Sequence, residues 1–192
     1  TQGIGSPGDT TASVAGGYVT LNDPSGTELW SLDDGRSHWT ARRLPDPGWI
    51  WVVGYSGLPR AAPEAIRSVR DRLAQPDGPD LLRRFEGIAR EGIRALCRED
   101  RGEVGARLTE NHQLLREVGV SHPRLEALLD AGRPAMLGGK LTGAGRGGSI
   151  VALPIPGREL ELARRIARAG GVPYVVRPSP HGAALVGSEP QP

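Results

Sequence analysis

The chain of 192 residues is poor in several features, and each shortage argues against a class of protein. Its single cysteine, Cys97, excludes an internal disulfide framework and a cysteine metal cluster, and is typical of a reducing cytoplasm, where we expect the protein. No apolar run approaches the roughly 20 residues that cross a bilayer, and the start lacks the basic-then-apolar pattern of a signal peptide. We therefore expect no membrane association.

Neither the net charge nor the spacing of the histidines indicates a nucleic-acid or metal ligand. The net charge is +2, and the arginines alternate with Glu and Asp along helical segments, which is typical of a solvated surface and predicts no nucleic-acid partner. The four histidines have no metal-ligand spacing, so we expect no metal ion held by protein side chains alone. With 38% hydrophobic and 24% charged residues, the composition is that of a folded globular protein.

Hydrophobic periodicity divides the chain into two regions. Residues 1–55 are rich in Gly, Ser, Thr and Trp, and their short β-type runs predict strands. From about residue 59 the pattern is helical, with strands returning near the end. Helices on one side of a small antiparallel sheet make an α+β fold, with residues 188–192 as a tail. The predicted strands are 17–21, 28–32, 49–53, 173–176 and 183–186; the helices are 63–75, 80–98, 102–118, 123–131 and 159–169; a strand–loop–strand unit covers 135–153.

The most informative stretch is Lys140-Leu-Thr-Gly-Ala-Gly-Arg-Gly-Gly-Ser149, which has four glycines in six positions directly before an apolar run. Glycine accepts backbone angles that side chains forbid, and consecutive N–H groups in such a turn form a nest for an anion, usually a phosphate. Lys140, the only lysine in the chain, adds a cation at the start of this loop. A glycine-rich turn can also be plain hairpin geometry without a ligand.

Four segments together resemble the GHMP kinases, and within them the archaeal mevalonate kinases. Residues 139–149 look like the third signature motif of that family, and Asn111-His-Gln-Leu-Leu-Arg-Glu-Val-Gly-Val-Ser-His-Pro123 resembles the helix and turn before it. Gly3-Ile-Gly-Ser-Pro-Gly-Asp-Thr10 is similar to the segment with the catalytic aspartate. Gly54-Tyr-Ser-Gly-Leu-Pro-Arg60 resembles the strand and turn that open the C-terminal domain.

The resemblance implies ATP-dependent phosphorylation of mevalonate to 5-phosphomevalonate in isoprenoid biosynthesis, with ATP as co-substrate and Mg²⁺ as the ion. It implies the end of the β-rich N-terminal domain over residues 1–55 and a ferredoxin-like C-terminal domain over 56–187. The family's Gly-Leu-Gly-Ser-Ser phosphate loop does not occur in this sequence. We therefore expect a C-terminal part of such a kinase, whose partner is a missing N-terminal half or a second copy of the chain.

The same resemblance implies a set of site residues. Asp9 would orient and deprotonate the attacking hydroxyl of mevalonate, although a turn or helix N-cap explains an aspartate there equally simply. Asn111 and His112 would lie near the substrate, with helix packing as the alternative for His112. Ser6 and Thr10 would flank the substrate, and the residues expected at the phosphates and nucleotide are Lys140, Thr142, Gly143, Ala144, Gly145, Arg146 and Gly147.

Two departures from the family pattern keep other functions open. Ala61-Ala62 stands where a hydroxyl-bearing pair is usual, and Arg146 replaces a glycine. Loss of a hydroxyl donor at a phosphate site costs about 1–3 kcal/mol. The alternatives are another GHMP enzyme, namely phosphomevalonate kinase, mevalonate 3-kinase or diphosphomevalonate decarboxylase, or a non-catalytic half of a split or degenerate kinase.

Overall fold

The computed structural model describes residues 7–33, 35, 37–59 and 62–183, and its helices and antiparallel sheets confirm the predicted α+β class. The chain divides into two compact units, Thr1–Trp49 with Pro178–Pro192, and Ile50–Arg177. Ser6, Arg60, Ala61 and the predicted strand residues 184–186 lie outside the described residues. Within the described ranges, the helices are too short or too polar to cross a membrane.

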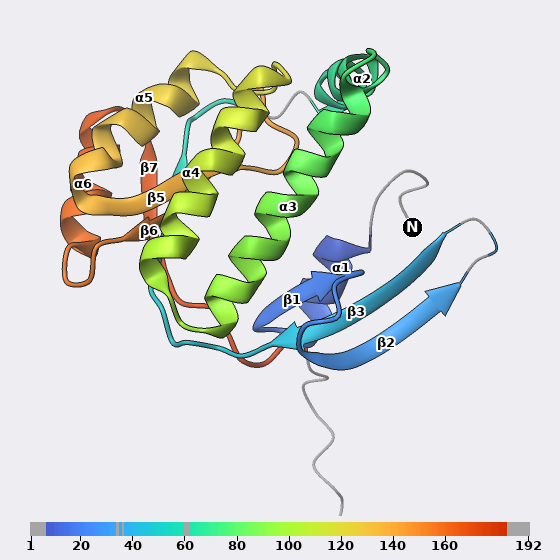
Figure 1. The fold of residues 1–192 in the computed structure, drawn as a ribbon. Helices are drawn as coiled ribbons and strands as arrows, with labels where there is room; N and C mark the ends of the chain where they lie inside the picture. Colours follow the sequence, from blue (N-terminus) through green and yellow to red (C-terminus); the bar gives the residue numbers. More distant parts are fainter. Residues whose placement is uncertain (1–6, 34, 36, 60–61, 184–192) are drawn as a thin grey trace, which may run out of the picture. The chain divides into compact units, whose positions relative to one another are not determined.

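The first unit contains helix α1 (Gly8–Ala15) and a three-stranded antiparallel sheet in the order β1-β3-β2 (Figure 1). Its strands are β1 (Tyr18–Leu21), β2 (Thr27–Asp33) and β3 (His38–Leu44). The predicted strands 17–21 and 28–32 are confirmed as β1 and β2. Sequence analysis missed α1 and β3, because Pro7-Gly8 is a typical turn pair and β3 carries adjacent arginines instead of an alternating apolar pattern.

The end of α1 is fixed by a returning segment of the same unit. The N–H of Gly17 donates to the carbonyl of Ser179 (2.6 Å), and the N–H of Ala183 donates to that of Ser13 (2.9 Å). Gly16 has a φ of +70°, and a Cβ there would lie 2.5 Å from the backbone of His181. The helix is therefore held at its C-terminal end by backbone contacts that only a glycine permits.

The second unit is a four-stranded antiparallel sheet in the order β5-β6-β4-β7 with helices packed against it (Figure 1). The helices α4, α5 and α6 contact the strands, α3 packs on α4, and α2 packs on α3. The predicted helices and strands of this region are confirmed to within two residues at their ends. The elements are β4 (Trp51–Tyr55), α2 (Ala62–Leu73), α3 (Gly78–Cys97), α4 (Arg101–Glu117), α5 (Pro123–Gly132), the 3₁₀ turn η1 (Arg133–Ala135), β5 (Met136–Thr142), β6 (Ser149–Pro154), α6 (Glu159–Arg168) and β7 (Val172–Val176).

The core of the second unit lies between the sheet and its helices. Alternate residues of the strands point into it, because successive side chains of a strand face opposite sides of the sheet. Removing these side chains from water supplies the main stabilisation, at about 1.5–3 kcal/mol for each large apolar side chain. The largest fully buried side chains of this core are Val52, Leu81, Leu114, Val120, Leu125, Leu128, Leu141, Ile150, Leu162 and Ile166.

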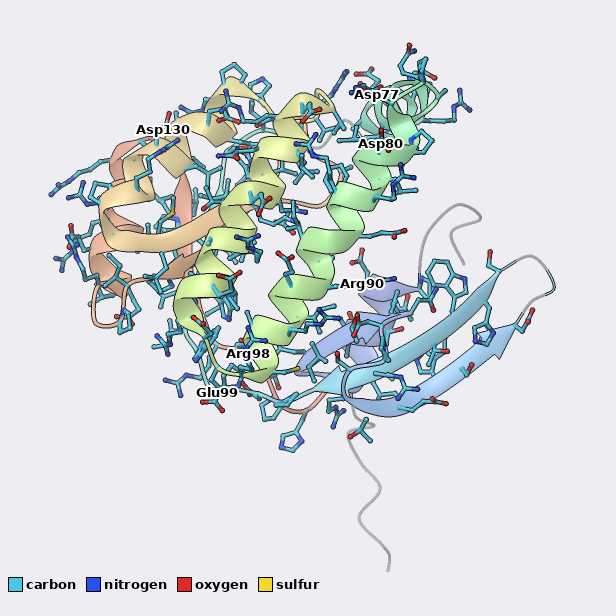
Figure 2. All side chains as sticks on the ribbon, in the orientation of Figure 1. Asp77, Asp80, Arg90, Arg98, Glu99 and Asp130 are labelled. Atoms are coloured by element: carbon cyan, nitrogen blue, oxygen red, sulfur yellow. The ribbon has the colours of Figure 1, made fainter. Side chains whose placement is uncertain are left out.

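Acidic side chains at the beginning of α3 complement the helix dipole. Figure 2 shows Asp77 and Asp80 at the beginning of α3, and Arg98 with Glu99 at its other end. Asp77 also accepts two hydrogen bonds from Arg72 of α2, both 2.7 Å long. An anion at a helix N-terminus is favourable, and the bidentate pair fixes α2 against the start of α3.

Helix α4 lies against β5 through two facing glycines. A Cβ on Gly105 of α4 would lie 2.7 Å from the backbone and side chain of Leu137, and a Cβ on Gly138 would lie 1.8 Å from the carbonyl oxygen of Gly105. Neither position has room for a side chain, so this approach of helix to strand requires both glycines.

We predict that Gly105→Ala lowers the free energy of unfolding by about 1–3 kcal/mol, because its methyl group overpacks a contact made of backbone. The matched control is Gly87→Ala in α3, where nothing lies within 4 Å of the added Cβ. That change should raise stability by up to about 1 kcal/mol through helix propensity alone. Urea denaturation of both variants measures the difference, and equal stabilities would contradict the close approach.

Candidate active site

The glycine-rich loop, residues 143–148, connects β5 to β6, with Thr142 and Ser149 paired at its base. Gly143, Gly145, Gly147 and Gly148 all have positive φ, between +76° and +133°. Arg146 has φ +55°, which costs a residue with a side chain about 1–2 kcal/mol. The loop is therefore strained at Arg146.

Two neighbouring segments hold the loop from its flanks. On one side, the N–H of Arg146 donates to the carbonyl of Val120 (2.7 Å) in the turn after α4. On the other, the N–H of Gly148 donates to the carbonyl of Leu58 (3.0 Å), and the N–H of Ser56 donates to the carbonyl of Gly148 (2.9 Å). These backbone hydrogen bonds hold the segment after β4 and the turn after α4 against the loop.

Two of the glycines are required by space as well as by conformation. A Cβ on Gly145 would lie 2.2 Å from the carbonyl oxygen of Val120, and one on Gly147 would lie 2.4 Å from that of Pro59. Within the part of the chain that the structure describes, no hydrogen bond is donated by the N–H groups of Gly143, Ala144, Gly145 and Gly147. Unpaired N–H groups on a narrow turn are the donors that a phosphate oxygen needs.

Lys140 and Thr142 lie on β5 beside the loop. Their side chains project from the face of the sheet opposite to Leu141, which is in the core, because strand residues alternate. Burial lowers the pKa of the Lys140 ammonium, and no carboxylate of the described residues pairs with it. A desolvated, unpaired cation at the base of an anion-binding turn is suited to a phosphate.

An apolar groove of about 510 Å³ adjoins the loop. Helix α2 provides one wall, while Gly143 and Ala144 of the loop and Val120 of the turn provide the other. The groove lies within the second unit, so the loop has apolar surface next to its free N–H groups. No pattern in the sequence predicted it, because its walls come from segments that are distant along the chain.

His112 and Asn111 lie on α4. His112 is buried and uses both ring nitrogens: Nδ1 accepts from the N–H of Leu141 (3.3 Å), and Nε2 donates to Glu126 (3.0 Å). These contacts are those expected from the packing alternative for His112, and the predicted substrate contact stays a prediction. The side-chain oxygen of Asn111 is buried and has no hydrogen-bond partner among the described residues, which leaves an acceptor for another group.

Asp9 and Thr10 belong to the first unit. Both side chains are exposed in the first turn of α1, where the helix dipole favours the Asp9 carboxylate. Pro7 is the N-cap, so Asp9 is a first-turn residue and not the N-cap. The structure thus places the loop, Lys140, Thr142, Asn111 and His112 in one unit, and Asp9 with Thr10 in the other.

Sequence analysis missed several residues that shape this region. Val120, Leu58 and Pro59 act through backbone carbonyls, and Glu126 acts as the acceptor for His112. A carbonyl that accepts a hydrogen bond leaves no trace in the residue type, so no sequence signal could have found the first three.

Comparisons with known proteins identify the family of this chain. Residues 93–172, from α3 to the start of β7, match the family model for the C-terminal region of GHMP kinases, and the chain belongs to this family. Within it, the chain is similar to the mevalonate kinase of Pyrococcus horikoshii, with 33% identity over 191 residues. That match covers 94% of this chain and 52% of the archaeal enzyme. The chain therefore spans about half the length of the curated relative.

Solved structures share the fold. The crystal structure of L. major mevalonate kinase in complex with R-mevalonate matches with a TM-score of 0.73 and 21% identity, over 96% of this chain and 55% of that one. Streptococcus pneumoniae phosphomevalonate kinase matches with a TM-score of 0.65 and 17% identity, over 72% and 44%. At these identities the matches show the fold alone, which does not distinguish the two substrates.

We predict that Gly145→Ala destabilises the second unit more than the matched change Gly157→Ala. Both glycines have nearly the same φ, +84° and +81°, so each alanine costs about 1–2 kcal/mol of backbone strain. Only Gly145 would place its Cβ against a carbonyl oxygen, which adds a further loss of about 1–3 kcal/mol.

Chemical denaturation of the two variants tests this difference. Equal losses of unfolding free energy would mean that the turn after α4 does not hold the loop as closely as described.

Proposed function

We propose that this chain is the C-terminal part of a mevalonate kinase, which transfers the γ-phosphate of ATP to the C5 hydroxyl of mevalonate in isoprenoid biosynthesis. The observation that carries the proposal is the 33% identity to an archaeal mevalonate kinase over 94% of the chain. We further propose that residues 1–55 end the N-terminal GHMP domain and 56–187 form the C-terminal one. A cytoplasmic location, and a missing N-terminal half or second copy as partner, belong to the same proposal.

In the proposed reaction, Asp9 accepts a hydrogen bond from the C5 hydroxyl of mevalonate and takes its proton. The oxygen then attacks the γ-phosphorus, the bond to the bridging oxygen breaks, and ADP leaves with that electron pair. The exposed Asp9 carboxylate accepts no hydrogen bond from the described residues and is available for this role. We propose that Ser6, Thr10 and Asn111 contact mevalonate, with the orphan oxygen of Asn111 as an acceptor.

The glycine loop would hold the phosphates. The N–H groups of Gly143, Ala144, Gly145 and Gly147, with the side chains of Lys140, Thr142 and Arg146, would stabilise the charge that develops on the transferred group. The described residues contain no group of three or more His, Cys, Asp or Glu side chains that could hold a metal ion. Because Mg²⁺ is usually held by one or two carboxylates together with substrate phosphates, we expect the ion to accompany ATP.

The first test assays the protein expressed from its complete natural coding sequence with ATP and, separately, mevalonate or 5-phosphomevalonate. Phosphorus NMR identifies the product. Formation of 5-phosphomevalonate supports the proposal, whereas turnover of 5-phosphomevalonate alone would identify a phosphomevalonate kinase. Binding of neither substrate by a folded protein would favour a non-catalytic half.

We predict that Asp9→Asn lowers kcat by about 10²–10⁴-fold while the Kd for ATP stays unchanged, because the proton acceptor is lost without altering the phosphate site. Asp46→Asn is the matched control in the same unit, since the new amide oxygen can still accept from the N–H of Gly48. Steady-state kinetics and ATP titration measure both effects. Full turnover in Asp9→Asn would rule out this residue as the base.

We predict that Lys140→Met raises the KM for ATP by about tenfold, because a charge-assisted contact to phosphate is lost. The same change should not lower stability, since the ammonium is desolvated and has no carboxylate partner among the described residues. Lys140→Arg keeps the charge and serves as the control. An unchanged KM for ATP in Lys140→Met would remove Lys140 from the phosphate site.

A further inference from the structure

The glycine loop depends on two supports that are distant in sequence. One is the end of β5, where Leu141 lies two residues before Gly143. The other is the turn after α4, where the carbonyl of Val120 accepts from Arg146 and lies against Gly145. The distance between these two supports sets the conformation of the loop, because only four residues lie between Leu141 and Arg146.

His112 connects to the first support at the open edge of the sheet. β5 is an edge strand, and the N–H of Leu141 donates to His112 Nδ1 at 3.3 Å. An edge strand leaves alternate N–H groups without a partner in the sheet, and a buried one needs an acceptor from elsewhere. The imidazole supplies that acceptor from α4.

His112 connects to the second support through one carboxylate. Its Nε2 donates to Oε1 of Glu126 (3.0 Å), and the hydroxyl of Ser121 donates to the same oxygen. Ser121 directly follows Val120, and Arg116 lies 3.5 Å from the other carboxylate oxygen. A single imidazole therefore bridges β5 and the turn that holds Arg146.

Only the neutral Nε2–H form of His112 satisfies both contacts. A protonated ring would direct an N–H from Nδ1 at the N–H of Leu141, and two donors cannot bond. Burial lowers the pKa of His112 below its usual 6.5; Glu126 opposes this effect, while Arg116 and Lys140 add to it. The stability that the contact with Leu141 contributes is therefore complete above pH 6.5 and is lost as the pH falls below that value.

We propose that His112 is a positioning residue for the glycine loop: its neutral ring bridges Leu141 and the Val120–Ser121 turn, and its protonation breaks the contact with Leu141 while the donor to Glu126 remains. The loop geometry follows from the described contacts alone. The consequence for catalysis rests on the proposed kinase function. Acidification then slows phosphoryl transfer because the loop is displaced, and not because a contact to the substrate is lost.

Two substitutions separate the two halves of the bridge. In His112→Asn, the amide oxygen can take the place of Nδ1 and accept from Leu141, but the donor to Glu126 is lost. In His112→Gln, the amide nitrogen can take the place of Nε2 and donate to Glu126, but the acceptor for Leu141 is lost. Neither amide titrates near neutral pH. Thr109→Val is the control on α4, where it removes a hydrogen bond to Gly105 that does not reach the loop.

The experiment measures hydrogen exchange of the Leu141 and Arg146 amides by NMR between pH 5 and 8, in the full-length protein, after correction for intrinsic exchange. We expect Leu141 to exchange about tenfold faster in His112→Gln and near the wild-type rate in His112→Asn, with the reverse ranking for Arg146. In the wild type, Leu141 should lose protection below pH 6.5 while Arg146 keeps it, and kcat should fall in parallel with the loss at Leu141. In His112→Asn, that acid-dependent loss at Leu141 should disappear.

Unchanged exchange at both amides in both variants would overturn the proposal, and a fall in kcat under those conditions would instead indicate direct substrate contact. If one variant does not fold, the other variant and the wild-type pH profile still decide between these outcomes. If the full-length protein has no kinase activity, the proposed function fails separately, while amide exchange alone decides whether His112 positions the loop.

Discussion

The second unit depends on the contact of α4 with the open edge of β5. At one end Gly105 meets Gly138 without side chains between them, and at the other His112 accepts from the N–H of Leu141. Seven helical residues span about 10.5 Å and three strand residues about 10 Å, so the two contacts have the same spacing along both elements. This match covers an edge that would otherwise expose unpaired backbone donors, and it fixes the strand that leads into the glycine loop.

The loop receives its shape from its neighbours more than from its own flexibility. Glycine permits the positive φ angles, but the carbonyls of Val120 and Pro59 leave room for nothing larger at Gly145 and Gly147. Arg146 adopts a left-handed conformation in the middle of this turn and is tied to Val120. A loop so constrained presents its free N–H groups in one arrangement, which is the condition for electrostatic stabilisation without reorganisation.

Much of this was predictable from local patterns. The apolar stripes of α3 and α6, the proline that begins α5 and the glycines before β6 each carry a strong signal, and the structure confirms these elements. β3 was missed because Arg42 and Arg43 interrupt its pattern; Arg42 is stabilised there by Glu28 on the neighbouring strand. α1 was missed because its ends are set by Pro7 and by the distant segment at Ser179.

The sequence by itself determined the α+β class, the helices of the second unit, the glycine loop and the family, because each follows from residue types at short spacing. Only the tertiary structure decided what His112 does, which carbonyls shape the loop, and that an apolar groove adjoins it. These features join residues that are far apart along the chain, often through backbone atoms that every residue possesses. Residue identity cannot encode such contacts locally, since they arise only when the helices and strands have packed.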